Sequence, residues 1–259
     1  MRKIYFCFIL RRFDKEKEKS YNKKERKLGK NAMEDKQIKK RVEKIKAELS
    51  AGNKYGEKVL LCAATKMQTA EDINLAIQAG VDAVAENKPQ EFRDKVENLL
   101  PCPKHFIGHL QTNKIKYLLG KIDLFHSCDR DELAEKLAEM SKGKGLVSDI
   151  LIQINVGEES SKGGYSYENA KETFLRLSQT EGLRVRGFMA MLPELEDEDL
   201  LRALARKMRC LFEWAKEQSS FVEYLSMGMS GDYKLCVEEG SNLVRLGSTI
   251  FGRRNYAEK

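Results

Sequence analysis

From residue 59 onward the chain alternates between short strand-like runs and longer helix-like segments, and no other feature constrains its fold as strongly. The short runs are apolar or β-branched, and the segments between them repeat their apolar residues with helical periodicity. Eight runs are candidate strands: Val59–Ala64, Ala83–Ala85, His105–Ile107, Leu124–His126, Ile150–Asn155, Val185–Met189, Glu223–Ser226 and Val244–Leu246. Because helical crossovers join successive strands, we expect the strands to be parallel.

The helix-like segments narrow the choice of fold. They cover residues 70–79, 90–99, 130–140, 167–179 and 198–218, and an amphipathic segment at about 36–51 precedes the first strand. Eight parallel strands joined in this way close into a barrel, whereas an open doubly wound sheet usually has fewer strands and a glycine-rich first turn. No GxGxxG or GxxxxGK[ST] motif occurs. The sequence predicts the α/β class: a single (β/α)8 TIM barrel preceded by an N-terminal helix.

The positive charge of the chain is confined to its first 32 residues. The formal net charge is +7, but residues 1–32 hold twelve Lys or Arg and four acids, which leaves 35 basic and 36 acidic residues in 33–259. A nucleic-acid or membrane-surface adaptor has only this tail in its favour, and alternating Lys and Glu is typical of a solvated helix or a disordered tail. We expect residues 1–32 to be a disordered or dispensable extension, residues 33–259 to form the barrel, and no binding of nucleic acid or membrane.

Neither export nor a metal site is expected. The apolar stretch Ile4–Leu10 is short for a signal peptide and has no small-residue cleavage site after it. Six cysteines are scattered without a CxxC pair, so they indicate no disulfide framework. Cys102 lies near His105 and Cys128 near His126, but a structural zinc site needs four ligands at recurring spacings. We expect reduced thiols and a cytoplasmic protein.

The ends of the predicted strands carry the residues with chemical potential, because barrel sites lie at the carboxyl ends of the strands. Lys66 follows the apolar run VLLCAAT, where burial would make its amine more nucleophilic towards aldehydes. A lysine that extends into solvent from a strand end would have the same spacing. The segments SMGMS (226–230) and RLGS (245–248) place small residues and backbone amides where barrels often bind phosphate, although ordinary turns have the same composition.

Seven segments resemble those of one known family. VLLCAATK, AENKPQE, HFIGHLQTNK, ILIQINVGEESSKGG, VRGFMAM, LSMGMSGD and VRLGSTIFG occur in the order seen in the pyridoxal phosphate homeostasis protein family. That family is similar to the N-terminal barrel of alanine racemase, and the resemblance covers about residues 33–256. It implies that the chain binds pyridoxal 5'-phosphate (PLP) as a cofactor, holds it on Lys66 as an aldimine, and acts in intracellular PLP homeostasis.

The resemblance also implies nine cofactor-binding residues: Lys66, Asn87, His109, Ser226, Met227, Gly228, Arg245, Gly247 and Ser248. Ser226, Met227, Gly247 and Ser248 would surround the phosphate. Arg245 would face the pyridine nitrogen, and Asn87 would lie near the ring. Asn113 would line the same mouth as His109. We interpret the other two histidines, His105 and His126, as core or strand-end residues.

Three positions depart from the pattern of the family. Thr65 replaces the more frequent Ser before the lysine, Lys88 and Pro89 follow Asn87 where Tyr-Val or Arg-Val is usual, and SKGG replaces SKSG at residues 161–164. None of these changes removes an expected cofactor contact. We expect the loop after the second strand to be shaped differently.

Binding without turnover is the prediction for this site. A guanidinium stays charged and only donates hydrogen bonds, so Arg245 would leave the pyridine nitrogen unprotonated and would weaken carbanion stabilisation. Racemisation needs an acid and a base on opposite faces of the α-carbon, and the resembling racemases supply a tyrosine from a second domain, whereas this chain ends at Lys259. We predict a non-catalytic PLP carrier, with amino acids and PLP-dependent client enzymes as candidate partners. A PLP-dependent amino-acid racemase is the alternative.

Overall fold

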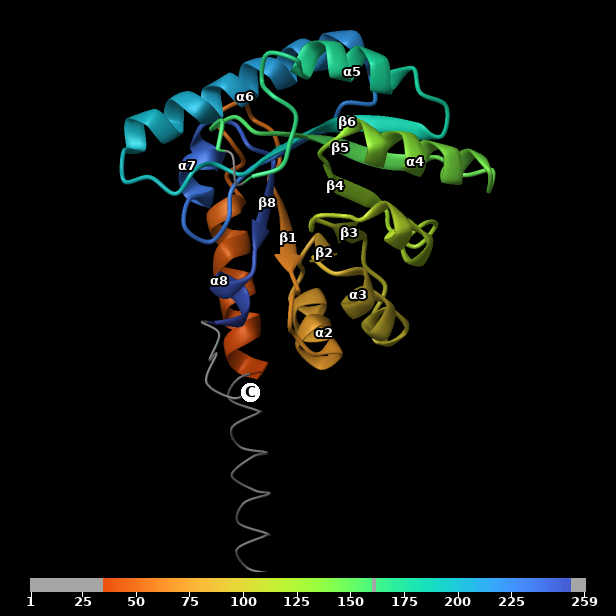
Figure 1. The fold of residues 1–259 in the computed structure, drawn as a ribbon. Coiled ribbons are helices and arrows are strands. Elements are labelled where there is room, and N and C mark those ends of the chain that lie inside the picture. Colours follow the sequence, from red (N-terminus) through yellow and green to blue (C-terminus); the bar gives the residue numbers. More distant parts are fainter. Residues whose placement is uncertain (1–34, 160–161, 253–259) are drawn as a thin grey trace, which may run out of the picture.

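Eight parallel strands form a closed barrel in the computed structural model, which describes residues 35–159 and 162–252 (Figure 1). They are β1 (Leu60–Ala64), β2 (Ala83–Glu86), β3 (Lys104–Phe106), β4 (Leu124–Cys128), β5 (Ser148–Ile154), β6 (Leu183–Ala190), β7 (Tyr224–Ser226) and β8 (Leu243–Leu246). Each strand pairs with the next, and β8 returns to β1 with Cys62 opposite Arg245. The (β/α)8 barrel predicted from the sequence is confirmed. The predicted extension at residues 1–32 lies outside the described residues.

The helices lie outside the barrel and connect successive strands (Figure 1). A first helix covers residues 35–49. The others are α2 (Ala70–Gln78), α3 (Pro89–Lys95), α4 (Asp131–Lys142), α5 (Ala170–Ser178), α6 (Glu198–Gln218), α7 (Tyr233–Glu238) and α8 (Ser248–Phe251), with 3-10 turns at η1 (Val96–Asn98) and η2 (Thr112–Tyr117). Local sequence sets several starts: the side chain of Thr69 caps α2, Pro89 opens α3, and Asp197 caps α6.

The helix predicted at residues 90–99 is shorter than expected, because α3 ends at Lys95 and the chain continues as the 3-10 turn η1. A tertiary contact accounts for this. The side-chain amide of Asn74 on α2 donates to the carbonyl of Asn98 at 2.9 Å and accepts from the N–H of Leu100 at 2.8 Å. The short elements η2, α7 and α8 were not predicted, since four to six residues are too few to show a periodicity.

The core has an outer part and an inner part. Between the barrel and its helices, Phe174 and Phe212 pack on the strands with Phe188, while Val42 and Ile45 of the first helix belong to the cluster around β1 and β8. A third cluster alternates with these residues along the strands and therefore faces the barrel interior. Its members are Cys62, Ala83, Ala85, Leu124, Leu151, Met189 and Leu243.

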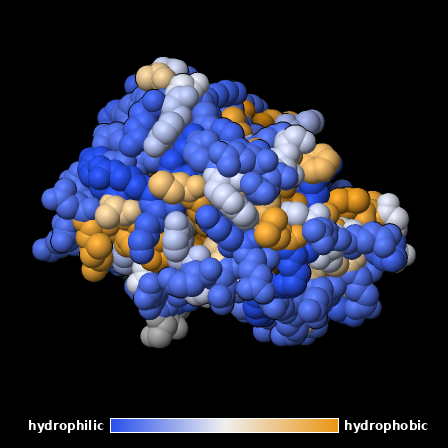
Figure 2. All heavy atoms as spheres, turned by 90° about the horizontal axis from the view of Figure 1, so that it is seen from above, coloured by the Kyte–Doolittle hydropathy of each residue, from blue (hydrophilic) through white to orange (hydrophobic). Residues whose placement is uncertain are grey.

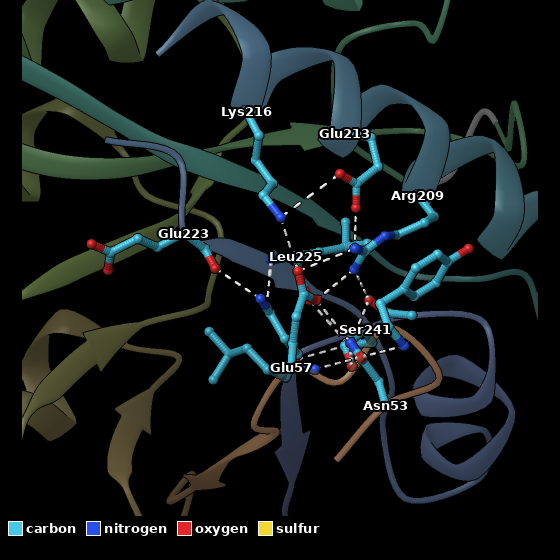
Figure 3. Close-up of polar contacts among 12 residues, drawn as sticks. Asn53, Glu57, Arg209, Glu213, Lys216, Glu223, Leu225 and Ser241 are labelled. Carbon is cyan, nitrogen blue, oxygen red and sulfur yellow. Dashed lines mark hydrogen bonds and ion pairs between the residues drawn. The ribbon is translucent and has the colours of Figure 1, made fainter. Parts of the chain in front are cut away.

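A network of polar side chains around the buried Arg209 lies at the amino ends of β1 and β8 (Figure 3). This foot network consists of Asn53, Glu57, Arg209, Glu213 and Lys216. The guanidinium of Arg209 on α6 donates to Glu57 Oε2 at 2.5 Å and to the carbonyl of Gly240 at 2.8 Å, and it also contacts Glu213. It thereby joins α6 to the loops that precede β1 and β8.

The face in Figure 2 is largely hydrophilic, with apolar side chains in several separate patches. Within the described ranges, no helix has the length and apolar character needed to cross a bilayer.

Candidate functional site

The carboxyl ends of the strands open onto a cavity of about 680 Å³, which we call the mouth cavity. Its lining residues follow or end six of the strands: Ala64, Lys66, Asn87, Ile107, Met189, Met191, Glu194, Met229, Ser230, Gly231, Arg245, Gly247 and Ser248. A volume of about 300–1,000 Å³ is typical of small-molecule sites. The position is also the one at which barrel proteins place their sites.

Lys66 occupies a turn that neighbouring side chains hold in place. Before it, the hydroxyl of Thr65 donates to Glu86 Oε1 at 2.7 Å. After it, Met67 has a φ of 64°, a left-handed conformation that is rare outside glycine, and its N–H donates to Glu91 Oε2 at 2.8 Å. These two contacts anchor the turn on both sides of the lysine, which is half-buried.

The acids near this turn are paired with another cation. Lys95 Nζ lies 2.9 Å from Glu86 Oε1 and 3.1 Å from Glu91 Oε2. Burial alone would raise the pKa of Glu91, but the hydrogen bonds from the Met67 N–H and from Lys95 lower it. Both carboxylates are therefore committed to Lys95 and the backbone, and the amine of Lys66 faces the mouth cavity.

Arg245, on β8, forms the floor of the mouth cavity and is 4% exposed. One terminal nitrogen donates to the carbonyl of Ser226 at 2.8 Å and to its Oγ at 2.5 Å, and the other donates to the carbonyl of Ala190 at 3.1 Å. Burial lowers the pKa of Arg245 from its ordinary value. A guanidinium nevertheless stays charged in proteins, so the floor of the cavity presents a cation held by neutral acceptors.

The loops after β7 and β8 supply small residues and hydrogen-bond donors. Gly228 has a φ of +100°, and a Cβ there would lie 2.8 Å from Tyr233 Cα, so the turn requires glycine. Gly231 has open space at this position, since a Cβ would meet nothing within 4 Å. Ser230 Oγ accepts from the N–H of Thr249 at 3.3 Å, which leaves the hydroxyl hydrogen free to donate. This donor set suits a phosphate group.

The structure brings together five of the nine residues predicted for the site. Those in the cavity lining are Lys66, Asn87, Arg245, Gly247 and Ser248. The remaining four, Ser226, Met227, Gly228 and His109, are not in that lining. Ser226 and Met227 are fully buried beneath it.

His109 departs most from its expected position. Its side chain is 64% exposed, and its Nδ1 lies 2.9 Å from the buried Asp129 Oδ2. Asn113 is also exposed, on η2. The lining residues Ile107 and Glu194 were missed by sequence reasoning, and their positions just beyond β3 and β6 were the only signal that could have nominated them.

The described cysteines and the side chains that could bind a metal were compared with the expectations from the sequence. The five cysteines within the described ranges, Cys62, Cys102, Cys128, Cys210 and Cys236, are free. Among the described residues, no group of three or more His, Cys, Asp or Glu side chains is arranged to hold a metal ion.

The barrel and its mouth cavity define a class of protein, the alanine racemase N-terminal domain, whose family model matches residues 36–255. Within that class, the chain is 41% identical over 199 residues to the pyridoxal phosphate homeostasis protein of Aquifex aeolicus (strain VF5), covering 76% of this chain and 87% of that one. It is 33% identical over 223 residues to the protein of the same name in Escherichia coli (strain K12), covering 84% and 95%. This chain belongs to the pyridoxal phosphate homeostasis protein family, as its motifs predicted.

Solved structures agree with this family assignment. PipY of Synechococcus elongatus PCC7942 with PLP bound is 28% identical, with a TM-score of 0.73 and coverage of 83% of this chain and 100% of that one. Alanine racemase of Clostridium difficile 630 has a TM-score of 0.69 at 16% identity, and the match covers 86% of this chain and 58% of the racemase. The racemase therefore shares the fold.

Proposed function

We propose that this protein binds PLP in the mouth cavity and takes part in PLP homeostasis. The observation that carries the proposal is the meeting of three features in one cavity: the amine of Lys66, the guanidinium of Arg245 and the small-residue loops after β7 and β8. The sequence separates these features by up to about 180 residues, and residues of all three line the mouth cavity. The names of the relatives and the PLP bound to PipY support the same cofactor.

The chemistry of the lining residues matches the parts of PLP. When bound, PLP supplies an aldehyde that condenses with a primary amine, and Lys66 provides that amine at the rim. Arg245 would offer hydrogen-bond donors to the pyridine nitrogen from the floor, and Asn87 would lie beside the ring. The phosphate is assigned to the backbone and hydroxyls of Gly247 and Ser248, together with the segment 229–231.

We further propose that the protein carries PLP without turning over amino acids. A permanently charged Arg245 leaves the pyridine nitrogen unprotonated, so the ring is a poor electron sink. The relatives are named as homeostasis proteins, which accords with this role. Client enzymes that receive PLP are the partners this role requires.

Visible absorbance of the purified protein, before and after borohydride reduction, tests the binding proposal. We expect an absorbing species that reduction fixes to one lysine, which peptide mass analysis maps to Lys66. Lys66→Ala should abolish it. Lys88→Ala, which removes an exposed lysine beside Asn87, is the matched control and should leave it intact. A colourless protein that takes up no PLP, or an adduct on another lysine, would refute the proposal.

Incubation with single-enantiomer amino acids, followed by chiral analysis, tests the carrier role. We expect no inversion above the rate of free PLP. Inversion that disappears in Lys66→Ala would instead identify a racemase.

A further inference from the structure

A line of buried polar side chains crosses the barrel interior and ends at the guanidinium that floors the mouth cavity. It consists of His105 on β3, His126 on β4, Ser226 on β7 and Arg245 on β8, and none is more than 8% exposed. Barrel interiors are usually filled by layers of branched apolar side chains. Buried polar groups are costly unless each has a partner, so the contacts within this line decide what it does.

The contacts form a continuous chain. Arg245 donates to Ser226 Oγ at 2.5 Å, Ser226 Oγ lies 3.0 Å from His126 Nδ1, and His126 Nε2 lies 3.0 Å from His105 Nδ1. Ser226 and His126 are 100 residues apart in sequence. Cys62 Sγ, on β1, lies 3.9 Å from His105 Nδ1 and is the last polar neighbour along the line.

Because arginine can only donate, it sets the donor-to-acceptor direction of this series of hydrogen bonds. A guanidinium has only donors, so Ser226 Oγ accepts from Arg245 and its own hydrogen is free to donate to His126 Nδ1. A neutral imidazole whose Nδ1 accepts carries its hydrogen on Nε2 and donates it to His105 Nδ1. Every contact then has one donor and one acceptor.

Both imidazoles are neutral near pH 7, as this direction requires. Burial is the main cause that lowers the pKa of His126 well below its ordinary value, and the neighbouring His105 and Arg245 act in the same sense. Burial also lowers the pKa of His105 to about 4, against a weaker opposing effect of Asp123.

We propose that His126 is a positioning residue for Arg245, which it orients through Ser226. Among the described residues, Arg245 forms no ion pair, and its acceptors are two carbonyls and the Ser226 hydroxyl. The guanidinium has no acceptor for the hydroxyl hydrogen of Ser226, so that hydrogen goes to His126 Nδ1, and this hydrogen bond fixes the direction of the Oγ lone pairs that accept from Arg245. The inference rests on the proposed binding of PLP, because the orientation of Arg245 matters through the cofactor above it.

A double-mutant cycle on PLP affinity tests the coupling. Since one hydrogen bond contributes on the order of 1 kcal/mol, His126→Leu should weaken PLP binding by roughly fivefold to tenfold and shift the visible absorption band. His126→Asn keeps an acceptor near the position of Nδ1 and should recover most of the affinity. If His126 acts through Ser226, adding His126→Leu to Ser226→Ala should cost little more than Ser226→Ala alone.

The outcomes separate this inference from the proposed function. Failure of the unaltered protein to bind PLP would refute the function. Normal PLP binding by a folded His126→Leu variant, or additive losses in the cycle, would overturn the positioning role. A change in unfolding free energy without any change in affinity or absorption band would likewise show that His126 is only structural.

Histidine 15N NMR tests the donor-to-acceptor direction of these hydrogen bonds in the unaltered protein, with or without PLP. The sequence contains only three histidines. We expect both buried imidazoles to be neutral and protonated on Nε2, and the exposed His109 serves as the reference. Protonation of His126 on Nδ1 would overturn the inference, and this measurement holds even if a variant fails to fold.

Discussion

Two buried arginines occupy opposite ends of the barrel and have opposite surroundings. Arg209, at the foot, is 3% exposed and contacts the carboxylates of Glu57 and Glu213 (Figure 3). Its guanidinium also lies 3.8 Å from the centre of the Tyr55 ring. Arg245, at the mouth, is 4% exposed and, within the described residues, donates hydrogen bonds to two carbonyls and a hydroxyl and to no carboxylate. The charge of Arg209 is neutralised by carboxylates of the protein, which suits a role in stability. The charge of Arg245 is not neutralised by these neutral acceptors, which suits an interaction with a ligand.

Backbone strain follows the same division. Among the described residues, the non-glycine residues with positive φ are Met67, after β1, and Glu158, after β5. Both lie at the mouth. Strain and uncompensated charge lower stability and tend to collect where a protein binds its ligand. The mouth is therefore arranged for binding and the foot for stability.

Arg209→Met should give the largest loss of stability. It removes the buried cation that Glu57 and Glu213 share and leaves them the partly exposed Lys216, and breaking a buried ion pair costs about 3–5 kcal/mol of unfolding free energy. Urea unfolding measures this loss. Lys207→Met, which removes an exposed cation of the same helix that has no ion pair among the described residues, is the matched control and should cost much less. Equal losses in the two variants would contradict a structural role for the foot network.

Arg245→Met should lower PLP affinity more than it lowers stability, the opposite of what we expect for Arg209→Met. No carboxylate is left unpaired among the described residues, and removal of a desolvated charge offsets part of the cost of the buried acceptors that lose their donor, so we expect a loss of about 1–2 kcal/mol of unfolding free energy, smaller than that of Arg209→Met. PLP affinity should fall by roughly tenfold or more, because charge-assisted hydrogen bonds contribute about 1.5–3 kcal/mol. Fluorescence titration measures the affinity and urea unfolding the stability. A loss of stability as large as that of Arg209→Met would remove the distinction between the two arginines.

Acid should weaken the foot. Burial alone would raise the pKa of Glu57, but hydrogen bonds led by that of Arg209 lower it to about 2. In the neighbouring Glu239, the hydrogen bond from Arg206 is the main cause of a pKa of about 2. The unfolded chain takes up these protons near pH 4.5 and the folded protein does not, so their stabilisation is present above that pH and is lost as the pH falls towards about 2.

Urea unfolding at about pH 7 and about pH 3.5 checks this dependence. Replacing both acids, Glu57→Gln with Glu239→Gln, should flatten the decline in stability between the two pH values. Glu194→Gln, at the mouth, is the matched control. An unchanged decline in the double variant would locate the acid sensitivity elsewhere.

Met67→Gly should have the smallest effect and the opposite sign. Relief of the positive φ should raise the unfolding free energy by up to about 1 kcal/mol relative to Met67→Ala, which keeps the strain. Because the turn that carries Lys66 becomes looser, we expect PLP binding to weaken slightly. A glycine variant less stable than the alanine variant would show that the strain is not stored there.

Much of the fold could be predicted because periodicity is local information. The alternating patterns predicted all eight strands within a few residues of their ends. The end of α3 could not be predicted, because the amide of Asn74 that ends it lies on another helix. The position of His109 was also out of reach, since its partner Asp129 comes from the next strand end.

By itself, the sequence determined a parallel eight-stranded barrel and a rim that includes Lys66, Gly247 and Ser248, because parallel strands with helical crossovers present their carboxyl ends at one edge. Only the tertiary structure decided which acceptors surround each buried arginine. Closure of the barrel brings His126 to Ser226 and the loop before β1 to Arg209, across 100 and 152 residues of sequence. Contacts of that range depend on how whole elements pack, and no local pattern of residues encodes them.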